Sequence, residues 1–263
     1  MRGYQEARDD VAVRETSHEA VAVAGDDAPG LLDRTLSRRT SDLQPGESST
    51  ALHLSPEGRT LHMVRVLRRA DEHVLVGETA RSLAESLEEG VFVEDVEFKD
   101  TDLVLLELRG PDADDHVPGD VDLLDTPMEG ADVLVPPDVD VEAPALSADA
   151  AEALRVEAGV PGEADLRGRL PLAAAEDAVD YSRCYPGQEV VARVAQRGRG
   201  PRERFVCLRS DDSVAEAEGV DVTTTARSPR HGYVALGYVD DETDDADLDV
   251  EVHEPPLDPG VRA

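Results

Sequence analysis

Acidic side chains outnumber basic ones by more than two to one, and this excess limits the conditions under which the chain can fold. Asp and Glu total 59 against 26 Lys and Arg, giving a formal net charge of −33 at pH 7. Such a charge destabilises a compact state by self-repulsion. At molar salt the Debye length falls to about 3 Å, and the repulsion is screened. Because the acidic residues are spread among Val and Leu along the whole chain, we interpret them as a halophilic adaptation. Mimicry of nucleic acid is the alternative.

The apolar residues are numerous enough for a core, and their types constrain how it packs. They make up 40% of the 263 residues, but aromatic residues are 3% and Trp is absent. The core is therefore expected to consist of Val, Leu and Ala, in one large domain or two to three small ones. No apolar run approaches the roughly 18 residues that span a bilayer, and the first residues lack the apolar segment of a signal peptide. We expect a cytoplasmic protein with no membrane partner.

Apolar periodicity predicts two units of mixed strands and helices, followed by an all-β unit. In the first two units, strands are expected before Gly25, over 48–77 with turns at 56–58 and near 70–72, over 91–110 and at 131–137. Helices are expected over 28–37, over 79–90 with Thr79 as cap, and over 147–159 between a Ser147 cap and a Gly159 stop. In the last unit, residues 188–210 are expected to form a β-hairpin, and residues 220–242 and 248–254 supply further strands.

Four segments of the chain carry a family resemblance: HEAVAVAGDDAPGLLDRTLSRRTSDLQPGESSTALHLSPEGR at 18–59, ALRVEAGVP at 153–161, CYPGQEVVAR at 184–193 and VTTTARSPRHGYVALGYV at 222–239. Taken in order, they resemble the YgfZ and glycine-cleavage T-protein-like family of folate-binding proteins. The third is close to the Lys-Gly-Cys-Tyr-x-Gly-Gln-Glu signature of the YgfZ branch, although Ser182 and Arg183 replace its Lys-Gly. Together the segments span nearly the whole chain.

The resemblance implies an α+β fold arranged as a three-domain cloverleaf around a central folate site. The folate-binding domain would be discontinuous, over 1–45 and 105–186, with a second α+β domain inserted at 46–104. Residues 187–263 would form a C-terminal β-barrel. The family usually has a helix in the region that corresponds to residues 133–150, which are too few here to hold it, so the first domain is expected to be trimmed.

Cys184 is the candidate reactive thiol. A thiolate is the reactive form, and nearby cations favour it. Arg183, Arg193 and the turn amides after Pro186 could supply that field. The alternative is a small buried filler, which is the common role of a free cysteine, and the resemblance to the cysteine signature favours function. The other cysteine, Cys207, lies in an alternating strand pattern and is expected to be core.

No metal site or disulfide framework is expected. Cys184 and Cys207 do not form a CxxC motif. Four thiolates usually hold an iron–sulfur cluster, so this chain does not hold one alone. The seven histidines show no metal-ligand spacing. His53 and His62 bracket the turn at 55–59 and could face the central cleft.

The family resemblance assigns Glu157 to the folate, because the matching carboxylate accepts hydrogen bonds from the pterin ring. A carboxylate near a helix C-terminus is disfavoured by the helix dipole, which suits a specific role. Its neighbour Arg155 would not share its face and is expected to form a separate ion pair. We also assign Arg193, Gln188 and Glu189 to cofactor binding. For the last two, stabilisation of the turn is an equal alternative.

Six arginines against one acid between residues 193 and 209 reverse the local charge. Within this run, Arg197, Arg199 and Arg202 are the candidate anion patch. The patch could bind the glutamate tail of a folate or an RNA backbone, or simply pair with acidic neighbours. Phosphate binding weakens steeply as salt rises, so direct nucleic-acid binding is not expected.

Three activities follow from the resemblance. Aminomethyl transfer needs an acid–base group near the folate, but where T-proteins carry an acid pair this chain has His62 and Met63, with Arg59 in place of a nearby Gly. A YgfZ-like role fits the cysteine motif better: a protein that binds tetrahydrofolate, or a one-carbon derivative, and supports assembly or repair of iron–sulfur enzymes and dependent tRNA modification. Its partners would be iron–sulfur enzymes or assembly factors. A non-catalytic folate-binding scaffold is the third possibility.

Overall fold

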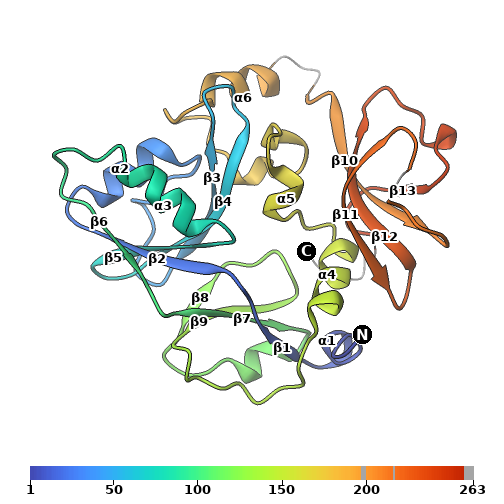
Figure 1. Ribbon diagram of the computed structural model, residues 1–263, viewed down its shortest axis with the longest axis horizontal. Helices are drawn as coiled ribbons and strands as arrows, with labels where there is room; N and C mark the ends of the chain where they lie inside the picture. Colours follow the sequence, from blue (N-terminus) through green and yellow to red (C-terminus); the bar gives the residue numbers. More distant parts are fainter. Residues whose placement is uncertain (197–199, 216, 258–263) are drawn as a thin grey trace.

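The computed structural model describes residues 1–196, 200–215 and 217–257 of the chain (Figure 1). These residues form three antiparallel sheets and six α-helices, so the predicted mixture of helices and strands is confirmed. The helices are α1 (Glu6–Asp9), α2 (Ala28–Thr35), α3 (Ala80–Glu88), α4 (Ala148–Glu157), α5 (Glu163–Leu166) and α6 (Gln188–Gln196). Short 3-10 helices lie at Ala113–His116, Pro171–Ala173, Glu176–Ala178 and Asp245–Asp247.

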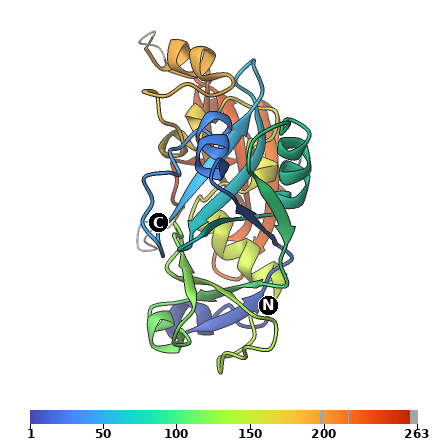
Figure 2. The ribbon, with the colours of Figure 1, turned by 90° about the vertical axis from the view of Figure 1, so that its left-hand side faces the viewer.

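The first sheet lies at one end of the molecule, at the bottom of both ribbon views (Figures 1 and 2). Its strand order is β1-β7-β9-β8. The predicted strands around residues 104–109 and 131–135 are confirmed, and β8 is an addition inside the segment expected to be mostly loop. The bounds are β1 (Ala12–Glu15), β7 (Val104–Arg109), β8 (Asp122–Leu124) and β9 (Gly130–Val135).

The second sheet has the order β3-β4-β5-β2-β6, and α2 and α3 cover one of its faces. Buried leucines of both helices, including Leu32 and Leu83, pack there against valines of the strands. The predicted helix starts are correct, but the Thr79 side chain makes no capping hydrogen bond to α3. The strands are β2 (Glu19–Ala24), β3 (Ser48–Leu54), β4 (Thr60–Arg68), β5 (Glu72–Gly77) and β6 (Glu97–Asp100).

The third sheet is open, so the predicted closed β-barrel is wrong. Its order is β11-β12-β10-β13, and the two edge strands do not pair with each other. The edge strand β11 instead packs beside α4 and α5. The strands are β10 (Glu203–Ser210), β11 (Val220–Ser228), β12 (Gly232–Asp240) and β13 (Glu251–His253).

Residues 188–196 form the helix α6, where the sequence analysis expected the first strand of a hairpin. Val191, Val194 and Ala195 recur at helical spacing and pack on the cluster around Leu52 and Leu172. A short Val- and Ala-rich run satisfies a strand pattern and a helix pattern equally. Tertiary packing decides in favour of the helix here.

The sheets connect the predicted domains more closely than the sequence suggested. Strand β2, from the predicted segment 1–45, pairs with β5 and β6 of the predicted inserted segment 46–104. Asp132 of β9 adds a buried ionic link, because its carboxylate pairs with Arg109 of its own sheet and with Arg65 of β4. Burial alone would raise the pKa of Asp132, but the two guanidinium groups lower it. The domain division itself stays a prediction.

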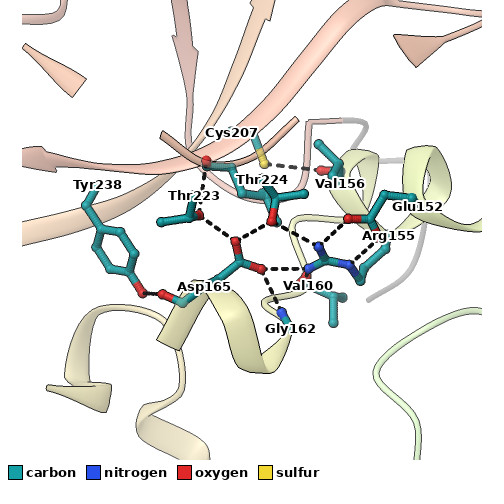
Figure 3. A network of polar contacts seen from close by, with 11 residues as sticks. Glu152, Arg155, Val156, Val160, Gly162, Asp165, Cys207, Thr223, Thr224 and Tyr238 are labelled. Atoms are coloured by element: carbon teal, nitrogen blue, oxygen red, sulfur yellow. Dashed lines mark hydrogen bonds and ion pairs between the residues drawn. The ribbon is translucent and has the colours of Figure 1, made fainter. Parts of the chain in front are cut away.

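Asp165 joins the third sheet to α4 and α5 (Figure 3). Its buried carboxylate accepts from Arg155 Nη1 at 2.8 Å and from the Gly162 amide at 2.8 Å. The hydroxyls of Thr223 and Thr224 also donate to it. Successive strand residues normally face opposite sides. The register of β11 shifts between Val222 and Thr224, and this bulge lets both threonines reach one acceptor.

Four donors therefore hold one carboxylate that is shielded from water. Burial raises the pKa of Asp165, but Arg155 and the hydroxyl donors outweigh it, and the net direction is downward. Arg155 also pairs with Glu152, so the prediction that Arg155 forms an ion pair separate from Glu157 is confirmed.

We expect Asp165→Ala to lower the free energy of unfolding by about 3 kcal/mol, because Arg155 and two hydroxyls lose a buried acceptor. Urea denaturation in molar KCl measures the change. Asp211→Ala is the matched control, since Asp211 is exposed after β10, and its effect should stay within about 0.5 kcal/mol. Equal losses in the two variants would contradict the central role of Asp165.

Candidate functional site

Glu157, the predicted folate carboxylate, is the last residue of α4 and is fully buried, with 0% of its surface exposed. The Tyr4 hydroxyl donates to both of its carboxylate oxygens, at 2.7 and 2.9 Å. Arg8 Nη1 pairs with Oε2 at 2.9 Å. The cation of Arg8 offsets the unfavourable position of a carboxylate at a helix C-terminus. Glu157 is thus a preorganised acceptor for donor groups.

Tyr4 and Arg8 were missed by the sequence analysis, although their spacing of four residues is one signal of a shared helical face. The pKa of Tyr4 is raised to about 12, first by burial and then by its hydrogen bond to Glu157. The phenol therefore keeps its proton and stays a donor at neutral pH. A ligand that uses both oxygens of Glu157 must replace the Tyr4 hydroxyl, which contacts each of them.

The neighbouring Gly159 is required where the C-terminal segment crosses α4. Its φ is +68°, and a Cβ there would lie 2.4 Å from the Cβ of Pro255. The main-chain amide of Leu257 donates to the Glu157 carbonyl. Cys207 lies beside this crossing, is buried as predicted, and has its pKa raised to about 12 by burial. Its thiol is therefore a core group rather than a reactive one.

Cys184, the candidate reactive thiol, is exposed, so it is not a buried filler. The adjacent Arg183 side chain is turned inward and pairs with Asp33, with Nη1 3.4 Å from Oδ1. Asp33 in turn accepts from the main chain and side chains of Thr40 and Ser41. The Arg183 cation is therefore engaged with Asp33 of α2. The thiol role of Cys184 stays a prediction.

The turn that follows Cys184 packs directly on the β3–β4 turn, backbone against backbone. Gly187 has a φ of +79°, and a Cβ there would lie 2.4 Å from the Ser55 carbonyl oxygen and 2.6 Å from Gly58 Cα. Gly58 has a φ of +77°. The Pro-Gly in the cysteine motif thus has a structural reason, because only glycine allows this approach.

Gln188, Glu189 and Arg193 lie together on α6 and line an open pocket of about 600 Å³ with Ala192 and Gln196. Gln188 also donates from Nε2 to the Tyr181 carbonyl at 2.9 Å. This contact supports the alternative that Gln188 stabilises the segment before the turn. No hydrogen bond or ion pair among the described residues joins this group to Glu157.

The predicted anion patch is only partly described. Arg197 and Arg199 lie outside the described residues, and Arg202 is exposed. Two other arginines of the basic run pair with acidic neighbours: Arg204 with Asp245, and Arg209 with Glu251. For these two, the reading as paired surface charges is confirmed.

A second open pocket, of about 570 Å³, was not predicted. It lies between residues 38–42 and residues 179–182. Arg38 and Arg39 supply its cations, while Asp42 and Asp180 supply carboxylates. The sequence signal was the Arg-Arg pair in an acidic chain. Because its charges are mixed and several of its groups are paired within the protein, the pocket alone does not identify a ligand.

The structure separates the predicted site residues into two regions. Both ribbon views place α6 at the end of the molecule farthest from the first sheet, and α4 lies well below it (Figures 1 and 2). Glu157 belongs to the lower region, whereas Gln188, Glu189 and Arg193 belong to the upper one. Cys184 precedes the upper group in the chain.

His53 and His62 face each other across β3 and β4 and form a stacked pair. Their ring centroids are 5.7 Å apart, with an angle of 14° between the planes. Burial, and then the neighbouring His62, lower the pKa of His53 to about 4. Burial also lowers the pKa of His62. Both rings are therefore neutral near pH 7.

No group of three or more His, Cys, Asp or Glu side chains in the described ranges is placed to hold a metal ion. No helix in them is long and apolar enough to cross a bilayer.

Comparison with known proteins supports the overall fold. No protein-family model and no curated protein match the sequence. Among solved structures, glycine cleavage system aminomethyltransferase T from Bartonella henselae matches with a TM-score of 0.75 and 21% identity, over 97% of this chain and 88% of that chain. Heterotetrameric sarcosine oxidase from Corynebacterium sp. U-96 matches with a TM-score of 0.35 and 18% identity, over 51% and 81%. The first match gives the chain a T-protein-like fold.

Gly187→Ala tests the turn-on-turn contact. We expect it to lower the free energy of unfolding by about 2–4 kcal/mol, because the new Cβ meets backbone atoms that cannot move aside. Gly168→Ala is the matched control: its φ is +75°, but nothing lies within 4 Å of its added Cβ. Its cost should be about 1 kcal/mol, from backbone strain alone. Equal costs in urea denaturation would contradict the packing explanation.

The histidine pair predicts acid sensitivity. The pKa of His53 is about 4 in the fold against an ordinary 6.5, so the unfolded chain takes up the proton first. The stabilisation is complete above pH 6.5 and is lost as pH falls towards 4. Between pH 6.5 and pH 4, we expect the free energy of unfolding to fall by about 1–2 kcal/mol less in His53→Gln than in wild type. The figure allows for the partial exposure of the ring.

Urea denaturation at a series of pH values measures this difference. His116→Gln, outside the stack, is the control and should follow the wild-type profile. Paired carboxylates such as Asp132 also lose stabilisation in acid. They are present in wild type and in both variants, so their contribution cancels when the pH profiles are compared. Identical pH profiles for His53→Gln and wild type would contradict the role of the stack.

Proposed function

We propose that this chain is a tetrahydrofolate-binding, YgfZ-like protein that supports assembly or repair of iron–sulfur enzymes and dependent tRNA modification. The observation that carries the folate part is the buried Glu157 carboxylate at the end of α4, within a T-protein-like fold. The folate could be tetrahydrofolate itself or a one-carbon derivative. The cytoplasm of a halophilic cell is the proposed setting, because the net charge of −33 needs screening.

Glu157 would bind the donor groups of the pterin ring. A carboxylate offers two oxygens to paired N–H donors, and charge-assisted hydrogen bonds are stronger than neutral ones. The Tyr4 hydroxyl and Arg8 occupy these oxygens in the structure. Binding would exchange the Tyr4 donor for ligand donors, while Arg8 keeps the carboxylate charge balanced.

Cys184 would act at a different region from the pterin, towards protein partners. Its exposure makes the thiol accessible to an iron–sulfur enzyme or an assembly factor. The packed turn at Gly187 fixes the chain just after it.

Aminomethyl transfer of the T-protein type is the second candidate. The match to the Bartonella henselae aminomethyltransferase over 97% of this chain favours it. His62 and Met63 stand in place of the acid pair of T-proteins, so the carboxylates that T-proteins have at these positions are missing from this chain. A folate-binding scaffold in which Cys184 has no chemical role is the third candidate.

Calorimetry with tetrahydrofolate in molar KCl, under anaerobic reducing conditions, tests the proposal. Wild type is expected to bind, and Glu157→Gln to bind about 10- to 100-fold more weakly, because an amide cannot replace two charge-assisted acceptors. Asp149→Asn, which removes an exposed charge from the same helix, should bind as wild type does. No binding by wild type would remove the YgfZ-like and transferase readings together. Unchanged binding by Glu157→Gln would place the folate elsewhere.

A further inference from the structure

His62 ends a chain of polar side chains that the proposed function does not use. Its Nδ1 lies 2.7 Å from the Thr79 hydroxyl oxygen. That hydroxyl donates to Glu163 Oε2 at 2.7 Å. Glu163 is 1% exposed, and its other carboxylate oxygen pairs with Arg167. Side chains from β4, the start of α3 and α5 therefore meet in one connected network.

The groups in this network determine which atom donates in each hydrogen bond. A carboxylate paired with a guanidinium only accepts, and the Met63 amide also donates to Oε2 of Glu163, at 3.3 Å. Thr79 has a single hydroxyl hydrogen, and the carboxylate takes it. The Thr79 oxygen must then accept from His62, so His62 carries its proton on Nδ1. The Nε2 atom is left with a free lone pair.

The Thr79 hydroxyl makes this network in place of a helix-capping hydrogen bond. Thr79 occupies the N-cap position of α3, where a threonine hydroxyl commonly accepts from the helix backbone and stabilises it by about 1 kcal/mol. The Thr79 side chain makes no such bond. Its hydroxyl instead links His62 and Glu163. This contact indicates a role for the hydroxyl beyond helix formation.

The Nε2 side of His62 is accessible. The residue is only partly buried, and no hydrogen bond to Nε2 is formed within residues 1–196, 200–215 and 217–257. The ring is held on one side by the parallel stack with His53. The imidazole is therefore fixed in orientation and tautomer while its basic nitrogen stays open.

The charges around His62 favour a neutral ring that can take up a proton. Burial lowers its pKa, Glu163 opposes that effect, and Arg167 adds to it. The stacked His53 on β3 is neutral near pH 7 for the same reason of burial. Before α3, Glu78 interacts with Glu163, and its own pKa is raised by burial and then by that charge. At the His62 ring the charge of Glu163 outweighs that of Arg167, which disfavours an anionic ligand.

We infer that His62 is a general acid–base group of this chain, held with Nε2 outward by the positioning residues Thr79 and Glu163. It takes a proton from an N–H or O–H group of an uncharged or cationic ligand. In that step the ligand N–H or O–H bond breaks, and its electron pair stays on the ligand. The new N–H bond forms at Nε2, and Glu163, acting through Thr79, stabilises the imidazolium. The inference is independent of folate binding.

Nitrogen-15 NMR of the full chain in molar KCl tests the assignment, because it reports the tautomer of each histidine. We expect His62 near pH 7 as the Nδ1–H form, whereas free histidine favours Nε2–H. Thr79→Val should remove this preference, and Thr79→Ser should restore it. Thr101→Val is the matched control: that hydroxyl donates to the Ala20 carbonyl, so its loss should leave His62 unchanged.

Reaction with diethyl pyrocarbonate, mapped by mass spectrometry, provides a second readout that needs no bound ligand. We expect its rate at His62 to fall at least threefold in Thr79→Val and to return in Thr79→Ser. Glu163→Gln, which keeps the size of the side chain, replaces Thr79→Val if the latter does not fold. An Nε2–H tautomer for wild-type His62, or a rate insensitive to both substitutions, would overturn the inference. Neither measurement uses folate. A result that contradicts the His62 inference is therefore distinct from a result that contradicts the proposed function.

Discussion

The arrangement of the molecule depends on one buried carboxylate, that of Asp165. It receives the guanidinium of Arg155, one main-chain amide and two threonine hydroxyls from β11 of the third sheet. A buried ion costs several kcal/mol in lost hydration, and it is tolerated only when its partners satisfy it. The four donors come from α4, the start of α5 and β11. The carboxylate therefore fixes where α4 ends relative to the third sheet, and with it the position of Glu157.

The sequence predicted local structure well where periodicity is long and turns are marked by glycine. The strand and helix before and after Gly25, the hairpin around residues 56–58 and the helix between Ser147 and Gly159 follow from such signals. It failed at residues 188–196, where a short Val- and Ala-rich run suits a helix or a strand equally. It also failed for the barrel, because whether two edge strands close depends on what packs between them.

The site was less predictable than the fold, because its important contacts join residues far apart in the chain. Glu157 was found through a motif, but its partners Tyr4 and Arg8 are about 150 positions away and carry no motif. The bulge that turns two threonines towards Asp165 leaves no mark in the sequence beyond the repeated Thr. Gly187 belongs to a signature that the sequence shows. The reason for a glycine there is its contact with the Gly58 turn, which only the fold reveals.

The bonds that Tyr4 and Arg8 make to Glu157 also bear on how quickly a ligand can reach that carboxylate. With both oxygens occupied and no exposed surface, diffusional encounter alone does not give access. The segment around α1 must first release its donor, so opening precedes binding. A ligand that enters in this way associates at a rate that levels off as its concentration rises. The lifetime of the closed state, rather than the chemistry of the ligand, then sets the response time.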